Sequence, residues 1–251
     1  MQLEARWRLE EKLWIPNGPE YLAHTMIYHA LGASDPEYTT KLHEKGKVPG
    51  NIHVYTHLLT DDPRSDDSMI QMQKDGSTIL KGNLLLTVRS ADASLILKLK
   101  EGFRKGAKLD SVYVSDVETE LSDPTVEEST IVIDMMSAIC VHRTDIVEKA
   151  GKEKKITVYL SPKEEEFYSR INSSFRRKYE AYYGVTPEED ITLSPISVPD
   201  KNYHTVYENH FHINGWKGRY LLKGKRKYLD FLYQTGIGSK NSQGFGMFEI
   251  V

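Results

Sequence analysis

The chain opens with strict alternation, and the patterns that follow leave few folds open to it. Every second residue from Leu3 to Leu9 is apolar, so these residues share one face of a predicted strand. Apolar residues between Tyr21 and Leu31 recur at helical spacing and cover half of a helix, with His24 and Tyr28 on the other half. The rest of the first half is predicted to form a short helix at 35–46, strands at 52–59 and 80–88, a helix at 93–104 and a strand at 112–118.

The second half of the chain repeats this order of elements. Gly184 is typical of a helix end, and the Asn214-Gly215 dipeptide favours a tight hairpin turn. The predicted elements are a strand at 131–141 that pairs with residues 156–160 across the loop 152–155, a helix at 161–183, a hairpin of residues 205–213 and 218–222, a helix at 225–233 and a closing strand at 245–251.

Each half therefore reads strand, helix, strand, strand, helix, strand. This order predicts an α+β protein of two tandem ferredoxin-like domains. A length of 251 residues suits two domains of ordinary size. Asp123-Pro124 interrupts the patterns midway, so we expect an N-terminal domain at 1–122 and a C-terminal domain at 125–251.

Composition excludes two classes of protein. Hydrophobic residues make up 39% of the chain, which is enough for buried cores. No apolar run approaches the ~20 residues of a membrane helix, which excludes a membrane protein. Cys140 is the single cysteine, which excludes a disulfide-framed secreted domain and favours the reducing cytoplasm. The formal net charge of −3 is unevenly spread, because residues 201–251 hold eight basic and three acidic residues. Such a region is typical of a local anion-binding surface.

A glycine-rich segment separates the last predicted helix from the last predicted strand. Gly236, Gly238, Gly244 and Gly246 would let backbone amides approach a phosphate, and Lys240 adds positive charge. The segment lacks the Gly-Lys-Ser/Thr of a Walker loop, and a strand follows it, which excludes a dinucleotide fingerprint as well. Residues 244–248 partly match the signature of an RNA-recognition motif, but a helix and a further strand would have to follow that signature. A phosphate-binding loop and a plain connection remain as alternatives.

A glycine-rich loop directly before the final strand of a second ferredoxin-like unit resembles the RAMP superfamily of CRISPR proteins. More narrowly, the chain is similar to the endoribonucleases that cut CRISPR repeat transcripts into guide RNAs. The resemblance extends to the helix around Tyr28 and to Leu42-His43-Glu44-Lys45-Gly46, which matches a Leu-His-x-x-Gly helix end. It covers the whole chain in architecture, whereas specific motifs occur only in these two regions.

The resemblance implies catalytic residues. Members of this family place a tyrosine on the first helix and a histidine about four turns on, and Tyr28 and His43 take those places. A lysine often follows the histidine, and Lys45 and Lys47 both lie near it; His24 shares the helix face of Tyr28. The chemistry is consistent, because RNA carries its own nucleophile, the 2′-hydroxyl, so the enzyme need only orient it and move protons. Histidine does this near neutral pH.

The implied partner is CRISPR repeat RNA, with subunits of a CRISPR effector complex as further candidates. Cations beside an aromatic residue at a hairpin tip suit phosphate contacts and base stacking. We expect a monomer or homodimer that needs no cofactor, metal or membrane. The predicted RNA-binding residues are the four glycines and Lys240 together with Trp216, Lys217, Arg219, Lys223, Lys225, Arg226 and Lys227.

The remaining histidines are weaker candidates. His142-Arg143-Thr144 matches one motif of the two-histidine phosphoesterases, but the second motif of that class is absent from the sequence. His210 and His212 share a strand face without a third ligand at helpful spacing, so a solvated or RNA-facing strand is favoured over a metal site. Structural positions are assigned to His29, His53 and His57.

The sequence thus predicts a metal-independent endoribonuclease that cleaves CRISPR repeat RNA. Attack by the 2′-hydroxyl would leave a 2′,3′-cyclic phosphate and a 5′-hydroxyl. The alternative is a non-catalytic RAMP-type subunit that binds guide RNA within an effector complex.

Overall fold

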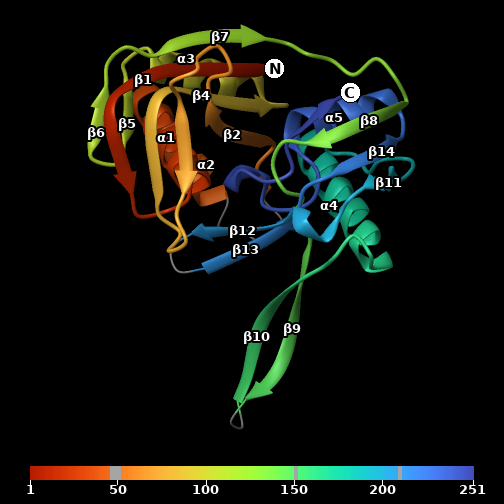
Figure 1. Ribbon diagram of the computed structural model, residues 1–251. Helices are drawn as coiled ribbons and strands as arrows, with labels where there is room; N and C mark the ends of the chain where they lie inside the picture. Colours follow the sequence, from red (N-terminus) through yellow and green to blue (C-terminus); the bar gives the residue numbers. More distant parts are fainter. Residues whose placement is uncertain (46–51, 150–151, 209–210) are drawn as a thin grey trace.

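The computed structural model describes residues 1–45, 52–149, 152–208 and 211–251. Two antiparallel sheets form the body of the molecule, one from each half of the chain (Figure 1). Their strand orders are β2-β4-β1-β7 and β11-β14-β8-β15. In each unit the third strand lies between the second and the first, and the fourth strand flanks the first. This is the ferredoxin-like arrangement, so the predicted fold of two tandem units is confirmed.

The first unit is organised around its opening strand. β1 (Gln2–Ile15) buries alternate side chains and pairs with β4 on one side and β7 on the other. The helix α1 (Pro19–Ser34) buries all six apolar residues that its spacing predicts. The other elements are α2 (Pro36–Lys45), β2 (Tyr55–Asp61), β3 (Met69–Met72), β4 (Thr78–Ser90), α3 (Ala93–Phe103), β5 (Ala107–Leu109), β6 (Val112–Val114) and β7 (Glu118–Ser122).

The second unit follows the same plan with two hairpins added. Its long helix ends at Gly184 in the left-handed conformation, as the sequence predicts. The elements are β8 (Thr130–Met135), β9 (His142–Lys149), β10 (Lys152–Tyr159), α4 (Glu165–Tyr183), β11 (Thr192–Ser197), a 3-10 turn η1 (Asp200–Asn202), β12 (Tyr203–Glu208), β13 (Phe211–Trp216), β14 (Arg219–Lys223), α5 (Arg226–Thr235), a second 3-10 turn η2 (Asn241–Gln243) and β15 (Phe248–Ile250).

The strands of the first half differ from the prediction at two places. The strand predicted at 112–118 is wrong, because its first part, β6, turns back onto β5 instead of joining the main sheet. The sheet is completed by β7, whose Thr119 lies opposite Ala5 of β1. The short strand β3, which pairs with β4 through Ile70 and Leu80, was not predicted.

The predicted hairpin around Asn214-Gly215 is also wrong. Both residues lie inside β13, where Asn214 faces Thr205 of β12. Gly215 is required for lack of space, because a Cβ atom there would come within 2.8 Å of the carbonyl oxygen of Ile139. The glycine therefore allows a close approach of two backbones rather than a turn. The second strand of the unit is β11, which was not predicted, and β14 pairs with both β11 and β8.

β9 and β10 form a two-stranded arm instead of joining the sheet. The prediction paired residues 156–160 with the strand at 131–141, but β10 pairs with β9, and Lys152–Lys155 belong to β10. The arm projects away from the body in Figure 1. Most of its described side chains are exposed or half-buried, and Ile146 is 62% exposed.

Each half has its own buried cluster, and the predicted boundary at 122–125 falls between them and stays a prediction. The first cluster runs from Leu3 to Leu109 in sequence, the second from Val126 to Phe248. One buried cation bridges them: Arg89 of β4, 2% exposed, donates to the carbonyl oxygen of Phe248 in β15 at 2.7 Å. No helix in the described part of the chain is both long and apolar enough to cross a membrane.

The contact between α1 and α3 yields a stability prediction. A Cβ atom at Gly102 would lie 1.9 Å from the carbonyl oxygen of Ala30, so Gly102→Ala forces the two helices apart. We expect the free energy of unfolding to fall by about 1–3 kcal/mol or more. Gly32→Ala is the matched control, since no atom lies within 4 Å of its added Cβ, and helix propensity should raise stability by about 0.5–1 kcal/mol. Urea unfolding measures both; equal effects of the two substitutions would contradict the packing.

Candidate active site

A polar stripe on α1 faces the junction between the two halves. Glu20, His24 and Tyr28 are spaced four residues apart, so they lie one above another on the helix face opposite the buried residues. The rings of His24 and Tyr28 are in contact, with centroids 4.8 Å apart. The Glu20 carboxylate points toward His204 of β12, with Oε1 and Nε2 3.8 Å apart.

The structure brings Tyr28 and His43 together. His43 lies on α2 and is exposed, and its ring meets the Tyr28 ring edge to face at a centroid distance of 6.0 Å. Tyr28, His24 and His43 therefore form one continuous aromatic group from two helices. The lysine candidates add nothing to this geometry: Lys47 and the side chain of Lys45 lie outside the described residues.

Burial keeps the Tyr28 hydroxyl protonated. Removal from water raises the pKa of Tyr28 above 10, and the neighbouring Tyr55 hydroxyl opposes this shift only in part. Tyr55 lies on β2 and is fully buried, which raises its own pKa well above 10. Tyr28 is thus a hydrogen-bond donor at neutral pH, half-buried at the edge of the group.

The glycine-rich loop, residues 236–246, has the conformation that its composition suggests. Gly236, Gly238, Gly244 and Gly246 all have positive φ angles, between 77° and 86°. At Gly246 the backbone also approaches closely, because a Cβ there would lie 2.0 Å from the carbonyl oxygen of Ile237. All four glycines are buried.

A buried lysine fixes this loop to the second half. Lys178 of α4 is 2% exposed, and its ammonium donates to the carbonyl of Gly236 and, at 2.8 Å, to Oδ1 of Asn241. Asn241 in turn donates to the carbonyl oxygen of Phe245 at 2.9 Å. Burial lowers the pKa of Lys178 to about 7. Hydrogen bonds to α4 and within the loop therefore hold it in a defined shape.

The other side of the loop lies against the first half. The carbonyl oxygen of Ser242 accepts hydrogen bonds from Nδ1 of His24 at 2.9 Å and from Nε2 of His57, on β2, at 3.1 Å. A Cβ at Gly244 would come within 3.2 Å of both Glu20 Cγ and His57 Cε1. The loop thus contacts the same α1 stripe that carries Tyr28.

This arrangement corrects the predicted use of the glycine amides. The amide of Gly244 donates to the carbonyl of Asn241, that of Gly246 to Ala138, and that of Gly236 to Leu232. These three N–H groups therefore donate within the chain, and a phosphate contact of the loop stays a prediction. Contact of RNA with other atoms of the loop, including Lys240, stays a prediction. Lys240 is half-buried, and its Nζ lies 3.2 Å from Oε1 of Gln243.

The predicted basic surface is split between the two ends of β14. Trp216 and Lys217 precede the strand and are half-buried, while Arg219 forms a bidentate ion pair with Asp134 at 2.6 and 2.8 Å. Beyond its other end, Lys225 pairs with Glu188. Of these surface cations, Lys217, Lys223 and Arg226 make no ion pair with a described residue, whereas Lys227 lies 3.9 Å from Glu188.

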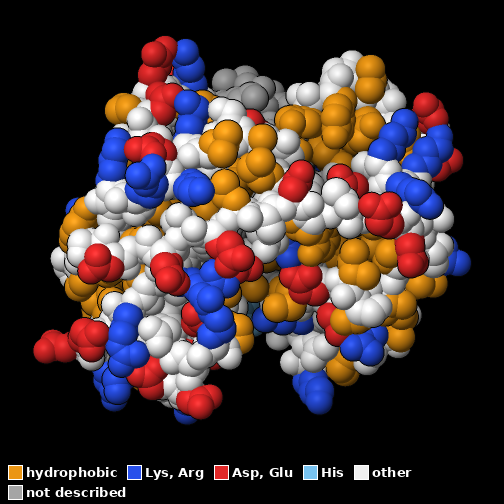
Figure 2. All heavy atoms as spheres, turned by 90° about the horizontal axis from the view of Figure 1, so that it is seen from above, with side chains coloured by type: hydrophobic (Ala, Val, Ile, Leu, Met, Phe, Trp, Pro, Cys, Tyr) orange, Lys and Arg blue, Asp and Glu red, His pale blue; other side chains and the backbone are white. Residues whose placement is uncertain are grey.

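Charge over the upper side of the molecule is mixed as well. Figure 2 shows Lys, Arg, Asp and Glu side chains intermingled there, with apolar patches between them. Recognition of a polyanion on this side would therefore need individual cations in defined places.

The remaining histidines are dispersed. His57 is fully buried, not half-buried, and burial together with His24 lowers its pKa to about 3. His142 is half-buried at the base of the arm, and burial lowers its pKa. His212 is exposed, and His210 lies outside the described residues. Among the described residues, no three His, Cys, Asp or Glu side chains are grouped to hold a metal ion.

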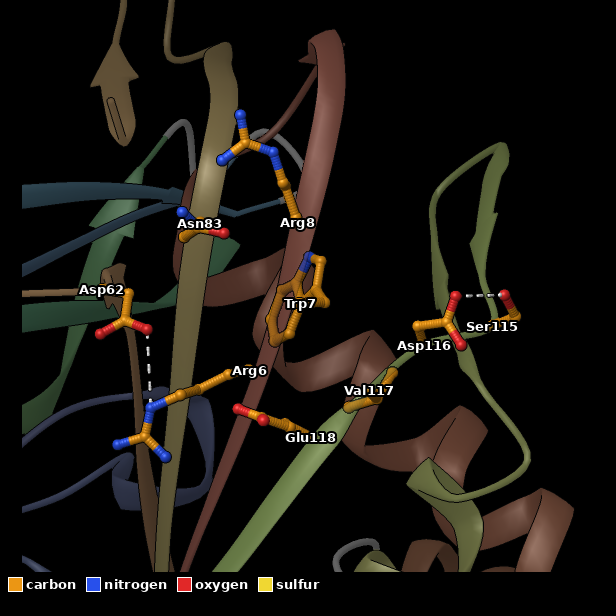
Figure 3. A pocket seen from close by; sticks show the side chains of 9 residues that line it. All are labelled: Arg6, Trp7, Arg8, Asp62, Asn83, Ser115, Asp116, Val117 and Glu118. Atoms are coloured by element: carbon orange, nitrogen blue, oxygen red, sulfur yellow. Dashed lines mark hydrogen bonds and ion pairs between the residues drawn. The ribbon is translucent and has the colours of Figure 1, made fainter. Parts of the chain in front are cut away.

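A separate pocket of about 430 Å³ lies on the first unit (Figure 3). Arg6 and Arg8 of β1 border it, with Asp62 and Asp116 among the facing acids. Arg6 Nε lies 3.6 Å from Asp62 Oδ2. The pocket contains none of the predicted site residues, and its lining carries more acidic than basic groups, which disfavours an anionic ligand.

Sequence reasoning missed Glu20, His57, His204 and Ser242 as parts of the site. The helical spacing of Glu20 with His24 and Tyr28 was a usable signal. No local pattern identifies the other three, because they reach the site only through contacts between segments far apart in the chain.

Comparisons with known proteins agree with this architecture. Residues 121–250 match the family described as CRISPR associated protein Cas6, C-terminal. The CRISPR-associated endoribonuclease Cas6 1 of Methanocaldococcus jannaschii is 22% identical over 98% of this chain and 91% of its own length. The CRISPR-associated endoribonuclease Cas6 of Pyrococcus furiosus is 22% identical over 94% of this chain and 83% of its own.

Solved structures show the same fold. A Cas6-related protein from Pyrococcus furiosus superposes with a TM-score of 0.77 at 22% identity, covering 100% of this chain and 98% of its own. A RAMP protein described as binding different RNA substrates gives a TM-score of 0.77 at 20% identity, covering 100% and 99%.

The buried His57 predicts a specific loss of stability in acid. Between pH 6.5 and about 3, the unfolded chain protonates this histidine while the native state does not. The free energy of unfolding should therefore fall as the pH falls, by up to about 1.4 kcal/mol per pH unit. His57→Gln should flatten this dependence, and it keeps a side-chain donor for Ser242. Urea titrations at pH 7 and pH 4.5 measure it, with the exposed His29→Gln as control. Equal acid sensitivity of His57→Gln and wild type would contradict the assignment.

Proposed function

This chain belongs to the Cas6 family of CRISPR-associated proteins, whose C-terminal region it carries at residues 121–250, and on that premise we propose that it is an endoribonuclease that cleaves CRISPR repeat RNA. One observation carries the proposal: Tyr28 and His43 come from two helices to form a single aromatic group with His24. The curated relatives are named as endoribonucleases, which supports the same activity.

The reaction we propose is an internal transfer within the RNA. The 2′-oxygen bonds to the adjacent phosphorus, the bond from phosphorus to the 5′-oxygen breaks, and the products are a 2′,3′-cyclic phosphate and a 5′-hydroxyl. One proton leaves the 2′-hydroxyl and one reaches the 5′-oxygen, so the enzyme must accept one proton and supply another. Because the nucleophile belongs to the substrate, neither a metal-bound water nor a covalent enzyme intermediate is required.

His43 and Tyr28 have complementary properties for these steps. Imidazole accepts or gives a proton near neutral pH, and the exposed ring of His43 exchanges protons with solvent. The hydroxyl of Tyr28 is protonated at neutral pH, and burial raises its pKa further, so it donates a hydrogen bond to the phosphate or the leaving oxygen. We propose His43 as the proton carrier and Tyr28 as the donor that stabilises developing charge.

We also propose that repeat RNA binds beside the glycine-rich loop and over the second unit. Of the predicted RNA-binding cations, Lys217, Lys223, Arg226 and Lys240 make no ion pair with a described carboxylate, and Trp216 offers an aromatic face. A purely guide-binding subunit of an effector complex would use the same surface. The two proposals differ in whether the isolated chain cuts RNA.

The chemistry of the cut is a direct test. Cleavage of repeat RNA should proceed in excess EDTA and yield a 2′,3′-cyclic phosphate. One 2′-deoxy nucleotide on the 5′ side of the cut should abolish cleavage because the attacking oxygen is missing. Binding should survive, since most of the contact energy comes from phosphates. Gel electrophoresis with end-labelled RNA reports both results. Inhibition by EDTA together with cleavage of the deoxy substrate would overturn the mechanism.

His43→Ala tests the proton carrier. Cleavage should fall by about 10²–10⁴-fold because proton transfer is lost, while affinity for a deoxy-blocked RNA stays close to wild type. His29→Ala is the matched control, as His29 is an exposed histidine that follows Tyr28 but makes no ring contact with His43. A rate for His43→Ala equal to that of His29→Ala would remove His43 from the mechanism.

A further inference from the structure

Two histidine rings converge on one backbone oxygen at the junction of the halves. The carbonyl of Ser242, in the glycine-rich loop, accepts from Nδ1 of His24 at 2.9 Å and from Nε2 of His57 at 3.1 Å. The three residues come from η2, α1 and β2, so the contact exists only when the two halves are docked.

A carbonyl oxygen accepts hydrogen bonds and never donates them. Nδ1 of His24 must therefore carry a proton whenever this bond is present, and in the neutral ring the lone pair is on Nε2. Protonation of Nε2 leaves the Nδ1 bond in place. The His24 ring is thus held in one orientation in both of its charge states.

We propose that His24 is a second proton-transfer residue of the site and that the carbonyl of Ser242 positions it, holding the proton on Nδ1 so that Nε2 is free to accept one. The proposal rests on the ribonuclease function proposed above. It gives each proton of the reaction its own imidazole. Nε2 of His24 accepts the proton of the 2′-hydroxyl as the bond from oxygen to phosphorus forms. His43, protonated beforehand, gives a proton to the departing 5′-oxygen.

The surroundings of His24 suit this role better than those of His57. Nε2 of His24 has no hydrogen-bond partner among the described residues, whereas the His57 ring is fully buried and unable to reach a substrate. The His24 ring contacts the Tyr28 ring, which in turn contacts His43, so both imidazoles lie against one phenol ring.

The charged and titratable groups that face His24 come from four elements. The rings of Tyr28 on α1 and His57 on β2 lie against it, and Glu20 is one turn earlier on α1. His43 on α2 reaches the group through Tyr28, and His204 on β12 through Glu20. A pH profile of cleavage that loses one limb must therefore be assigned by substitution and not by its midpoint alone.

The alternative is that His24 only seals the junction, and substitutions separate the two roles. Glutamine at position 24 retains an amide donor for Ser242 but offers no basic nitrogen. We expect His24→Gln to lower the single-turnover cleavage rate by about 10²-fold or more, to remove the acidic limb of the pH profile and to leave affinity for deoxy-blocked RNA near wild type. His29→Gln should leave the rate near wild type, because this exposed histidine of the same helix makes no hydrogen bond to Ser242. Gly244→Ala should slow cleavage, since its Cβ presses on Glu20 and His57.

Nitrogen NMR of the full chain supplies a readout independent of cleavage. With the ring neutral, the ¹⁵N shifts of His24 should show a protonated Nδ1 and an unprotonated Nε2 in wild type. Ser242→Ala keeps the backbone carbonyl, so it should show the same tautomer. The opposite tautomer would overturn the proposal. So would a His24→Gln rate within about threefold of wild type, because a lost proton acceptor costs far more than that; the ribonuclease function would then stand without it. A wild-type chain that does not cut repeat RNA would overturn both.

Discussion

The joining of the two halves of the molecule depends on the contacts of the Arg89 guanidinium. It lies on β4 with 2% of its surface exposed, where an unpaired charge would be costly. Its partners are Gln2 of its own sheet, the Phe248 carbonyl and the Glu249 carboxylate of β15, and the Tyr233 ring of α5, 4.0 Å below it. Separation of the two halves would leave this charge without its partners in the second half. The last strand of the second unit is thereby held against the sheet of the first.

The geometry of the candidate site depends on these contacts of Arg89. The glycine-rich loop leads directly into β15, so the strand that Arg89 holds also delivers Ser242 to α1. Lys178 holds the loop from the opposite side through Asn241. The loop is consequently fixed at both faces before any RNA binds. Its proposed role is thus the placement of side chains, in addition to any phosphate contact of its own.

Features that depend on local sequence patterns could be predicted, whereas features that depend on long-range contacts could not. The buried face of α1 follows from residue spacing alone, and the order of elements predicts the ferredoxin-like fold, although β7 and β11 were not among the predicted strands. The Asn214-Gly215 hairpin is wrong because a local turn signal was overridden by close backbone packing against Ile139. The β9–β10 arm was missed because its alternation is compatible with any sheet edge, and only tertiary space decides where it pairs.

The candidate site shows the same division. Tyr28 and His43 were predicted through a family resemblance, and their ring contact gives that prediction a geometry while their catalytic roles remain proposals. The contacts of His24 and His57 with Ser242 span 218 and 185 residues of sequence, so no local reading could contain them.

The fit of Gly244 against Glu20 and His57 has a consequence for how such chains diverge. With 3.2 Å between a notional Cβ and both neighbours, the loop of one half is shaped to the helix and strand of the other. The two ferredoxin-like units therefore cannot be exchanged between relatives as independent modules. A chimera joined at residues 123–125 would bring together a loop and a helix that had drifted apart. A change in size at Glu20 or His57 would therefore disturb the fit of the loop as well as its own unit.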